Sequence, residues 1–413
     1  MNAIRAFLCL PCLLFILGGE GRMWAAGEEY RSWTNQEGRQ VEAAFGGVQN
    51  GVVSLKLRSG VVAPVPLDKL SSEDQEWVHQ NGAKPALNPS PAGGLSPKSP
   101  GAPGKDWPKT VSLPDAPKAT AVKEDAEAKE FTYRTEHFEF RSPARLGADV
   151  VREFGRMFEG TMEVNRQLPL GINPTPENGQ EYFVAKLYLT MDDYLKDGGV
   201  KGSAGVYSGG ARAVQVPLGS LGVKMVGKRY MVEQGKDSDT LIHEITHQMM
   251  NHWLGKLPEW YVEGSAMYVG SCVFHPSGTF TLPRLGQTVK KLQHIGPGKH
   301  LIWHLNYLMH ITNQQWSAGF GNNPDGTVQR NYTSAIALTY FLYHGDDKGD
   351  GAHMISFMKD IADGKNKDDA QNEHIIRGRD YSVIEKEMTT FLRRGGITVE
   401  FVDGPVKSGT AAQ

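Results

Sequence analysis

The residues best suited to chemistry lie in the segment 239–250, DTLIHEITHQMM. Its apolar residues recur at four-residue intervals: Leu241, Ile245 and Met249. This spacing predicts a buried helix, which we expect to end at Gly255. His243 and His247 lie one turn apart on that helix, so both imidazoles can reach one metal ion. Glu244 stands beside the first histidine, where its carboxylate can face a metal-bound water without binding the metal.

A third metal ligand is present in the next segment, 257–268, LPEWYVEGSAMY. Pro258 favours the start of a second helix, which a short turn connects to the first. Glu263 lies on this second helix, sixteen positions after His247. Two histidines and a glutamate, with water in the fourth position, form a catalytic zinc site. The spacing therefore predicts a zinc centre at His243, His247 and Glu263.

Two other residues are alternatives for the third ligand. His252 lies one residue away from the position of the last histidine in the HExxHxxGxxH arrangement, which here holds Trp253. Glu259 lies one turn before Glu263 on the same predicted helix. The alternative to a metal site is a structural helix with surface histidines, in which HExxH occurs by chance. The downstream glutamate is what favours a metal site.

The chemistry expected of such a centre is metal-assisted hydrolysis of a peptide bond. Zinc lowers the pKa of a bound water to about 7 and polarises the scissile carbonyl. Glu244 would accept the water's proton during attack and deliver it to the departing amine. No serine–histidine or cysteine–histidine arrangement points to a covalent alternative, and we expect Cys272 to be a core residue.

The chain from about residue 131 to 396 resembles a peptidase-MA-like gluzincin, a group found in exported bacterial proteins. The matching motifs are His243-Glu244-x-x-His247 and Pro258-x-Trp260-x-x-Glu263-Gly264-x-Ala266. The resemblance implies that the two histidines and Glu263 bind zinc and that Glu244 is the catalytic base. The small Gly264 would permit close helix packing near the metal.

The same resemblance implies a tyrosine whose hydroxyl stabilises the tetrahedral oxyanion. Tyr332, at the start of a helix predicted over 331–342, is the candidate, with Tyr340 and Tyr343 as alternatives expected in the core. Related enzymes also present an edge strand to the peptide backbone, and residues 211–217 (ARAVQVP) best fit that place. The Gly-x-Met-Glu-Asn pattern that binds a free amino terminus in some aminopeptidases is missing, which favours an endopeptidase.

Residues 27–81 predict a small SH3-like β-barrel. Four short strand-like runs alternate with turns that contain glycine, and a short helix with Trp77 follows them. The stretch resembles the SLA homology domain (type one, SHD) in Trp33-Thr34, Phe45-x-Gly47 and Val65-Pro66-Leu67-x-x-Leu70. That domain binds short peptide motifs in an endocytic adaptor, so a protein- or peptide-binding role is implied. Tryptophans that only pack the core are the alternative interpretation.

The segments on either side of this module have other compositions. Residues 1–26 are expected to be a cleavable signal peptide with a cut near Ala26, so we expect a secreted or periplasmic protein. Residues 82–130 are expected to be a Pro-rich linker, since nine of the 23 prolines lie between residues 82 and 118. A domain over 131–400 and a tail over 401–413 complete the chain.

Composition excludes several other classes of protein. The 44 Lys and Arg residues are scattered and balance 46 Asp and Glu residues, which argues against nucleic-acid binding. No apolar run reaches the roughly 18 residues of a transmembrane helix, and three cysteines cannot build a disulfide scaffold. The expected fold class is α+β: the SH3-like barrel, the linker, then a zincin (gluzincin-like) domain with a mixed sheet and a mainly helical C-terminal part.

Three functions fit these expectations. The first is an active zinc endopeptidase with a peptide or protein substrate. The second is a zinc-binding hydrolase that acts weakly or not at all on peptides. The third is a non-catalytic protein-binding protein in which the zincin domain is a scaffold. Zinc content compared between the natural chain and Glu244→Gln separates the first from the third, because that change should leave zinc bound and abolish turnover.

Overall fold

The computed structural model describes residues 30–36, 38, 40–49, 52–57, 62–81, 107–177, 179–233, 238–283, 299–317 and 326–405. The chain divides into two compact units between Pro97 and Lys98. Strands and helices occur together in both units, so the protein is α+β as the sequence predicts. The predicted signal peptide, residues 1–26, lies outside the described residues.

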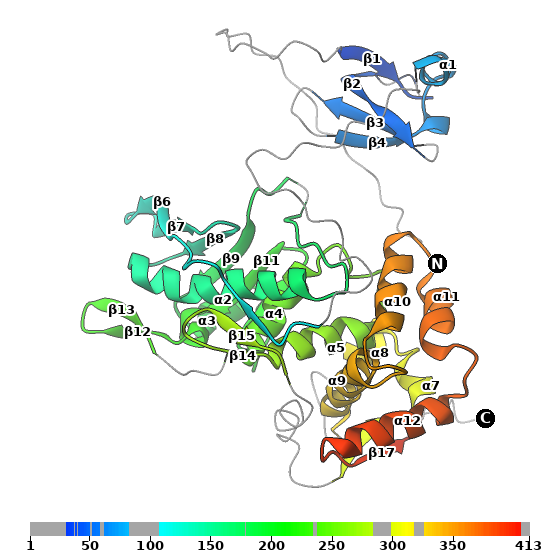
Figure 1. Ribbon diagram of the computed structural model, residues 1–413. Coiled ribbons are helices and arrows are strands. Elements are labelled where there is room, and N and C mark those ends of the chain that lie inside the picture. The colour runs from blue at the N-terminus through cyan, green and yellow to red at the C-terminus, as the bar shows by residue number, and fades with distance from the viewer. Residues whose placement is uncertain are drawn as a thin grey trace, which may run out of the picture. The chain divides into compact units, whose positions relative to one another are not determined.

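The first unit is a four-stranded antiparallel meander followed by a short helix (Figure 1). In chain order its elements are β1 (Tyr30–Thr34), β2 (Gln40–Gln49), β3 (Val52–Leu57), β4 (Val62–Pro66) and α1 (Ser72–Asn81). Trp33 is fully buried and donates its indole N–H to the Ala43 carbonyl across 3.0 Å. Phe45 stacks on its ring and Trp77 meets it edge-on. The four strands and the helix agree with the prediction, and Trp33 is a core residue.

The second unit is built on a six-stranded mixed sheet in the order β10-β11-β9-β8-β7-β6. Its strands are β6 (Thr120–Asp125), β7 (Glu130–Arg134), β8 (Phe138–Ser142), β9 (Phe183–Tyr188), β10 (Val206–Ser208) and β11 (Ala213–Pro217). The neighbours β8, β9 and β11 run parallel, and the remaining pairs are antiparallel. Strand β8 is covered by α2 (Ala148–Gln167), whose Phe154 and Phe158 meet Phe140 edge-on. This aromatic layer joins the sheet to its first helix.

Three helices extend the core beyond the sheet. Helix α4 (Asp239–Met249) packs against α2 and contacts β10 and β11, and α5 (Glu259–Gly270) packs between α4 and α9 (Thr327–His344) (Figure 1). The other elements of this unit are β5 (Thr110–Ser112), α3 (Met191–Lys196), β12 (Val223–Val226), β13 (Arg229–Val232), β14 (Val273–Phe274), β15 (Thr279–Thr281), β16 (His300–Trp303), α7 (Leu305–Leu308), α8 (Asn313–Ser317), α10 (Ala352–Ala362), α11 (Lys367–Gln371), α12 (Tyr381–Arg394) and β17 (Val399–Val402).

The second unit includes residues that the sequence predicts as linker and tail. Strand β5 pairs with β15 and buries Val111, while β6 forms the far edge of the six-stranded sheet. The prediction of a linker up to residue 130 is therefore wrong for 107–130, because β5 pairs with the distant β15 and β6 pairs with the neighbouring β7. The predicted tail also begins too early, since Val402 pairs with Trp303 in the parallel β16–β17 ladder.

Two predicted elements near the candidate site differ in the structure. Helix α4 ends at Met249 rather than near Gly255, which lies at φ +82° in the turn that leads into α5. Residues 213–217 form an inner strand, because the short β10 pairs antiparallel with β11 and takes the edge position. The prediction that 211–217 is the edge strand is therefore wrong, and Val206–Ser208 holds that place.

Candidate metal centre

Helices α4 and α5 bring three potential metal ligands together. The Nε2 atoms of His243 and His247 lie 3.0 Å apart. Oε2 of Glu263 lies 3.2 Å from Nε2 of His243 and 3.6 Å from Nε2 of His247. The four-residue step along α4 places both rings on one face, and the packing of α5 on α4 supplies the carboxylate. All three side chains are nearly buried, with exposed fractions of 11% to 13%.

The three atoms have the separations expected of ligands to one small metal ion. Zinc donors at about 2.0–2.2 Å in a tetrahedral arrangement stand roughly 3.3–3.5 Å from one another. Oε2 of Glu263 is buried without a hydrogen bond of good geometry, and so is Nδ1 of His247. Imidazole nitrogens with one carboxylate oxygen are also a ligand set that zinc accepts. The residues therefore fit a zinc ion.

Electrostatics within this group favour a cation between the three side chains. Burial by itself lowers the pKa of His247, but the adjacent Glu263 carboxylate outweighs burial and raises that pKa to about 9. Burial acts in the opposite sense on Glu263, yet His247 and His243 hold the pKa of its carboxyl well below its usual range. A proton on His247 thus balances the buried carboxylate, and a bound dication would take over that role.

Glu244 faces the edge of the six-stranded sheet. Its Oε2 accepts a hydrogen bond from the backbone N–H of Tyr207 in β10, across 2.9 Å. Glu244 is half-buried and does not belong to the group of three convergent donors. Its place beside His243 fits a base that acts on a water molecule rather than a metal ligand.

Tyr332 is the predicted tyrosine that lies beside this group. It lies near the start of α9, and its ring centroid is 6.2 Å from that of His243. Burial raises the pKa of Tyr332, and the carboxylates of Glu263 and Glu244 raise it further, so the phenol stays protonated. Tyr340 instead donates to the Pro283 carbonyl and Tyr343 to the Tyr261 hydroxyl, as expected of core residues.

The alternative third ligands lie outside the group of donors. Glu259 accepts a hydrogen bond from Asn313 Nδ2 at 3.0 Å, and burial raises the pKa of its carboxyl. His252 is exposed in the turn after α4. The close approach of α5 to α9 depends on Gly264, where a Cβ would lie 2.7 Å from the Ala335 carbonyl oxygen. Only glycine fits at that crossing.

Tyr207 is the residue near the site that the sequence analysis missed. Strand β10 has only three residues, too few to show an alternating pattern. The glycines on either side, Gly205 and Gly209, mark the short strand. Gly205 lies so close to β11 that a Cβ would meet the Gln215 carbonyl oxygen at 3.0 Å.

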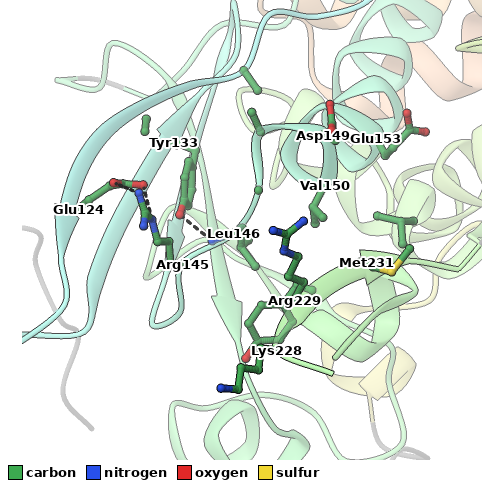
Figure 2. Close-up of a pocket in the computed structure, with 16 residues that line it drawn as sticks. Glu124, Tyr133, Arg145, Leu146, Asp149, Val150, Glu153, Lys228, Arg229 and Met231 are labelled. Carbon is green, nitrogen blue, oxygen red and sulfur yellow. Dashed lines mark hydrogen bonds and ion pairs between the residues drawn. The ribbon is translucent and has the colours of Figure 1, made fainter. Parts of the chain in front are cut away.

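The described residues also contain a second group of convergent donors and a pocket. Asp360, Glu373 and His374 also converge, but Lys365 donates to both carboxylates and supplies the positive charge there. A pocket of about 880 Å³ opens between β7, the start of α2 and the β12–β13 hairpin, as Figure 2 shows. None of the sequence-predicted site residues lines this pocket, and no histidine or cysteine does.

Comparison with known proteins informs the first unit. Residues 24–84 match the family model described as SLA1 homology domain 1, SHD1. None of the curated proteins compared with the chain matches it. The match at residues 24–84 makes the N-terminal unit an SHD1-type module, which indicates protein binding.

In the part of the chain that the structure describes, no helix has the length and apolar character needed to cross a membrane.

Proposed function

We propose that this protein is an exported zinc-dependent metallopeptidase, an endopeptidase with a zincin domain and an N-terminal protein-binding module. The observation that supports the proposal most directly is the convergence of His243, His247 and Glu263 beside a fourth polar side chain, Glu244. A metal ligand set with an adjacent carboxylate and a nearby protonated phenol is suited to hydrolysis.

Each side chain has a distinct task in this reaction. When bound by the three donors, zinc polarises a scissile carbonyl and makes a water molecule acidic. Glu244 accepts the proton of that water as it attacks and passes it to the leaving amine. Tyr332 donates its hydroxyl to the oxygen of the tetrahedral species, where negative charge develops. No covalent enzyme intermediate is required.

The edge strand β10 supplies a place for the substrate backbone. Tyr207 lies opposite Val214 in the antiparallel pair, and its N–H points away from β11 toward Glu244. In an antiparallel strand the carbonyl of a residue points to the same side as its N–H. The Tyr207 carbonyl can therefore accept a hydrogen bond from an extended peptide that adds to this edge.

Metal analysis of the purified chain tests the proposal. We expect about one zinc per chain, lost in His243→Ala, and cleavage of members of a peptide library. Glu244→Gln should keep the zinc and lose turnover, because it keeps the fold and removes only the base. A natural chain without zinc after reconstitution would contradict the proposal.

A second function is favoured by the SHD1 match over residues 24–84. The chain would then be a non-catalytic protein-binding protein in which the zincin domain is a scaffold. This alternative predicts a chain that binds a protein partner through residues 24–84 and cleaves no peptide with or without zinc. The same zinc and peptide-library experiment separates the two functions.

A further inference from the structure

Tyr207 connects the edge strand to Glu244 through its backbone and to the rest of the unit through its side chain. The backbone N–H donates to Glu244. The phenol of the same residue donates to Oε1 of Glu177, in the loop between α2 and β9. A short displacement of β10 would therefore also move the Glu244 carboxylate, because the Tyr207 N–H holds it.

The carboxylate of Glu177 is itself held in place. Arg212, at the turn between β10 and β11, lies with its Nε 3.2 Å from Oε2 of Glu177. Arg212 has a positive φ of 49°, a conformation that non-glycine residues adopt rarely. The loop is also attached to the end of α4, where Asn251 Nδ2 donates to the Thr175 carbonyl at 3.0 Å. The loop thus connects the edge strand to the helix that contains both histidines.

We propose that Glu177 and Arg212 are positioning residues that hold Tyr207, and with it strand β10, at the distance where the Tyr207 N–H orients Glu244. This inference rests on the proposed function and extends it to residues outside the metal ligand set. The phenol of Tyr207 provides the link, because it is the only part of that side chain that can donate to Glu177. Burial raises the pKa of Tyr207, and Glu177 raises it further, so the phenol stays a donor at working pH.

Two substitutions test the inference against one matched control. Tyr207→Phe and Glu177→Gln each remove the hydrogen bond or the charge while they keep the shape of the side chain. Tyr188→Phe is the control, because Tyr188 also donates its hydroxyl to a carboxylate, that of Asp197, but lies on β9 inside the sheet. For each variant we measure zinc content, hydrogen–deuterium exchange over residues 205–210, and kcat and KM for a cleaved peptide.

We expect Tyr207→Phe and Glu177→Gln to keep their zinc and to raise exchange over 205–210 about tenfold, the effect of losing one hydrogen bond to a charged group. The ratio kcat/KM should fall about 10- to 100-fold, with a fall in kcat, because small misplacements of a catalytic group are costly. The double variant should be no worse than the more affected single variant, since both changes act on the contact between Tyr207 and Glu177, and Glu177→Gln also loses the ion pair with Arg212. Tyr188→Phe should change neither the exchange over 205–210 nor kcat/KM by more than about twofold.

Several results would overturn the inference. Unchanged exchange over 205–210 would do so, as would an equal effect of Tyr188→Phe or a rise in KM with kcat unaltered. A natural chain that cleaves no peptide would contradict the proposed function alone. In that case the exchange experiment still decides the inference: faster exchange in both variants supports the positioning role, and unchanged exchange refutes it.

Discussion

Gly264 of α5 lies against Thr339 of α9 with no space for a side chain between them. A Cβ at Gly264 would stand 2.1 Å from Thr339 Oγ1 and 2.7 Å from the carbonyl oxygen of Ala335. The hydroxyl can rotate away, but the carbonyl belongs to a helix backbone and cannot. This crossing fixes the side of α5 that presents Glu263, one residue earlier, to the histidines.

Gly264→Ala should therefore loosen the α5–α9 contact and displace Glu263. We expect a loss of about 1–3 kcal/mol in the free energy of unfolding, the usual cost of overpacking a core. Zinc affinity should fall as well, because one ligand moves. Thermal melts with and without zinc check both effects. Adding Thr339→Ala should restore only part of the loss, and full restoration would show that the backbone contact is unimportant.

Glu263→Gln and Glu259→Gln form a matched pair on one helix. Glu263 converges with the histidines, whereas Glu259 accepts a hydrogen bond from Asn313. We expect Glu263→Gln to weaken zinc binding by more than about 100-fold, since removal of residues outside the ligand set already costs 10- to 100-fold. Glu259→Gln should bind zinc like the natural chain. Competition with a chelator measures the zinc affinity of both variants. Equal losses of affinity would show that Glu263 is not the distinctive third ligand.

Tyr332→Phe should lower kcat with little change in KM. The phenol stays protonated beside Glu263 and Glu244, so it can donate to the developing oxyanion. Loss of one such donor costs about 100- to 1,000-fold in kcat. Tyr340→Phe is the control, because its hydroxyl donates to the Pro283 carbonyl. Steady-state kinetics of both variants on one peptide decide whether Tyr332 has this role.

His344 should make the second unit less stable in mild acid. Burial lowers the pKa of His344 from 6.5 to about 4, and its Nε2 lies 2.9 Å from the Tyr268 hydroxyl. The unfolded chain takes up a proton below about pH 6.5, whereas the folded chain does so only near pH 4. The contribution of His344 to the free energy of unfolding is therefore complete above pH 6.5. It falls by about 3 kcal/mol as the pH is lowered to 4. Urea unfolding across this range should show a flatter profile for His344→Gln than for the natural chain.

Trp33→Ala should unfold the first unit and spare the second. Trp33 is the largest buried side chain of a small core that also contains Val53, Leu55 and Val78. Removal of a buried tryptophan costs about 3–5 kcal/mol, which a unit of this size rarely has in reserve. Zinc content should not change. A single melting transition that moves as a whole would show instead that the two units unfold together.

Local sequence rules were sufficient where neighbours along the chain decide the structure. The four-residue apolar spacing of α4, the proline before α5 and the glycine turns of the first unit each depend on a few adjacent residues. The same rules place His243 and His247 on one face of a helix. They misplace the end of α4, because Met250 to Lys256 continue in turns whose hydrogen bonds resemble those of a helix.

Contacts between distant segments decided the rest. Residues 110–112 become a strand only because residues 279–281 pair with them, and composition alone gives them the character of a linker. The place of β10 at the sheet edge depends on its pairing with β11, so sequence pattern assigned the edge to the wrong strand.

The sequence by itself determined which residues are able to bind a metal and act as a base, because ligand type and helical spacing are local properties. The tertiary structure decided that Glu263 rather than Glu259 meets the histidines, that Tyr332 rather than Tyr340 lies beside them, and that Tyr207 contacts Glu244. Each of these choices depends on how helices and strands pack. Packing brings together residues whose separation along the chain follows no fixed spacing.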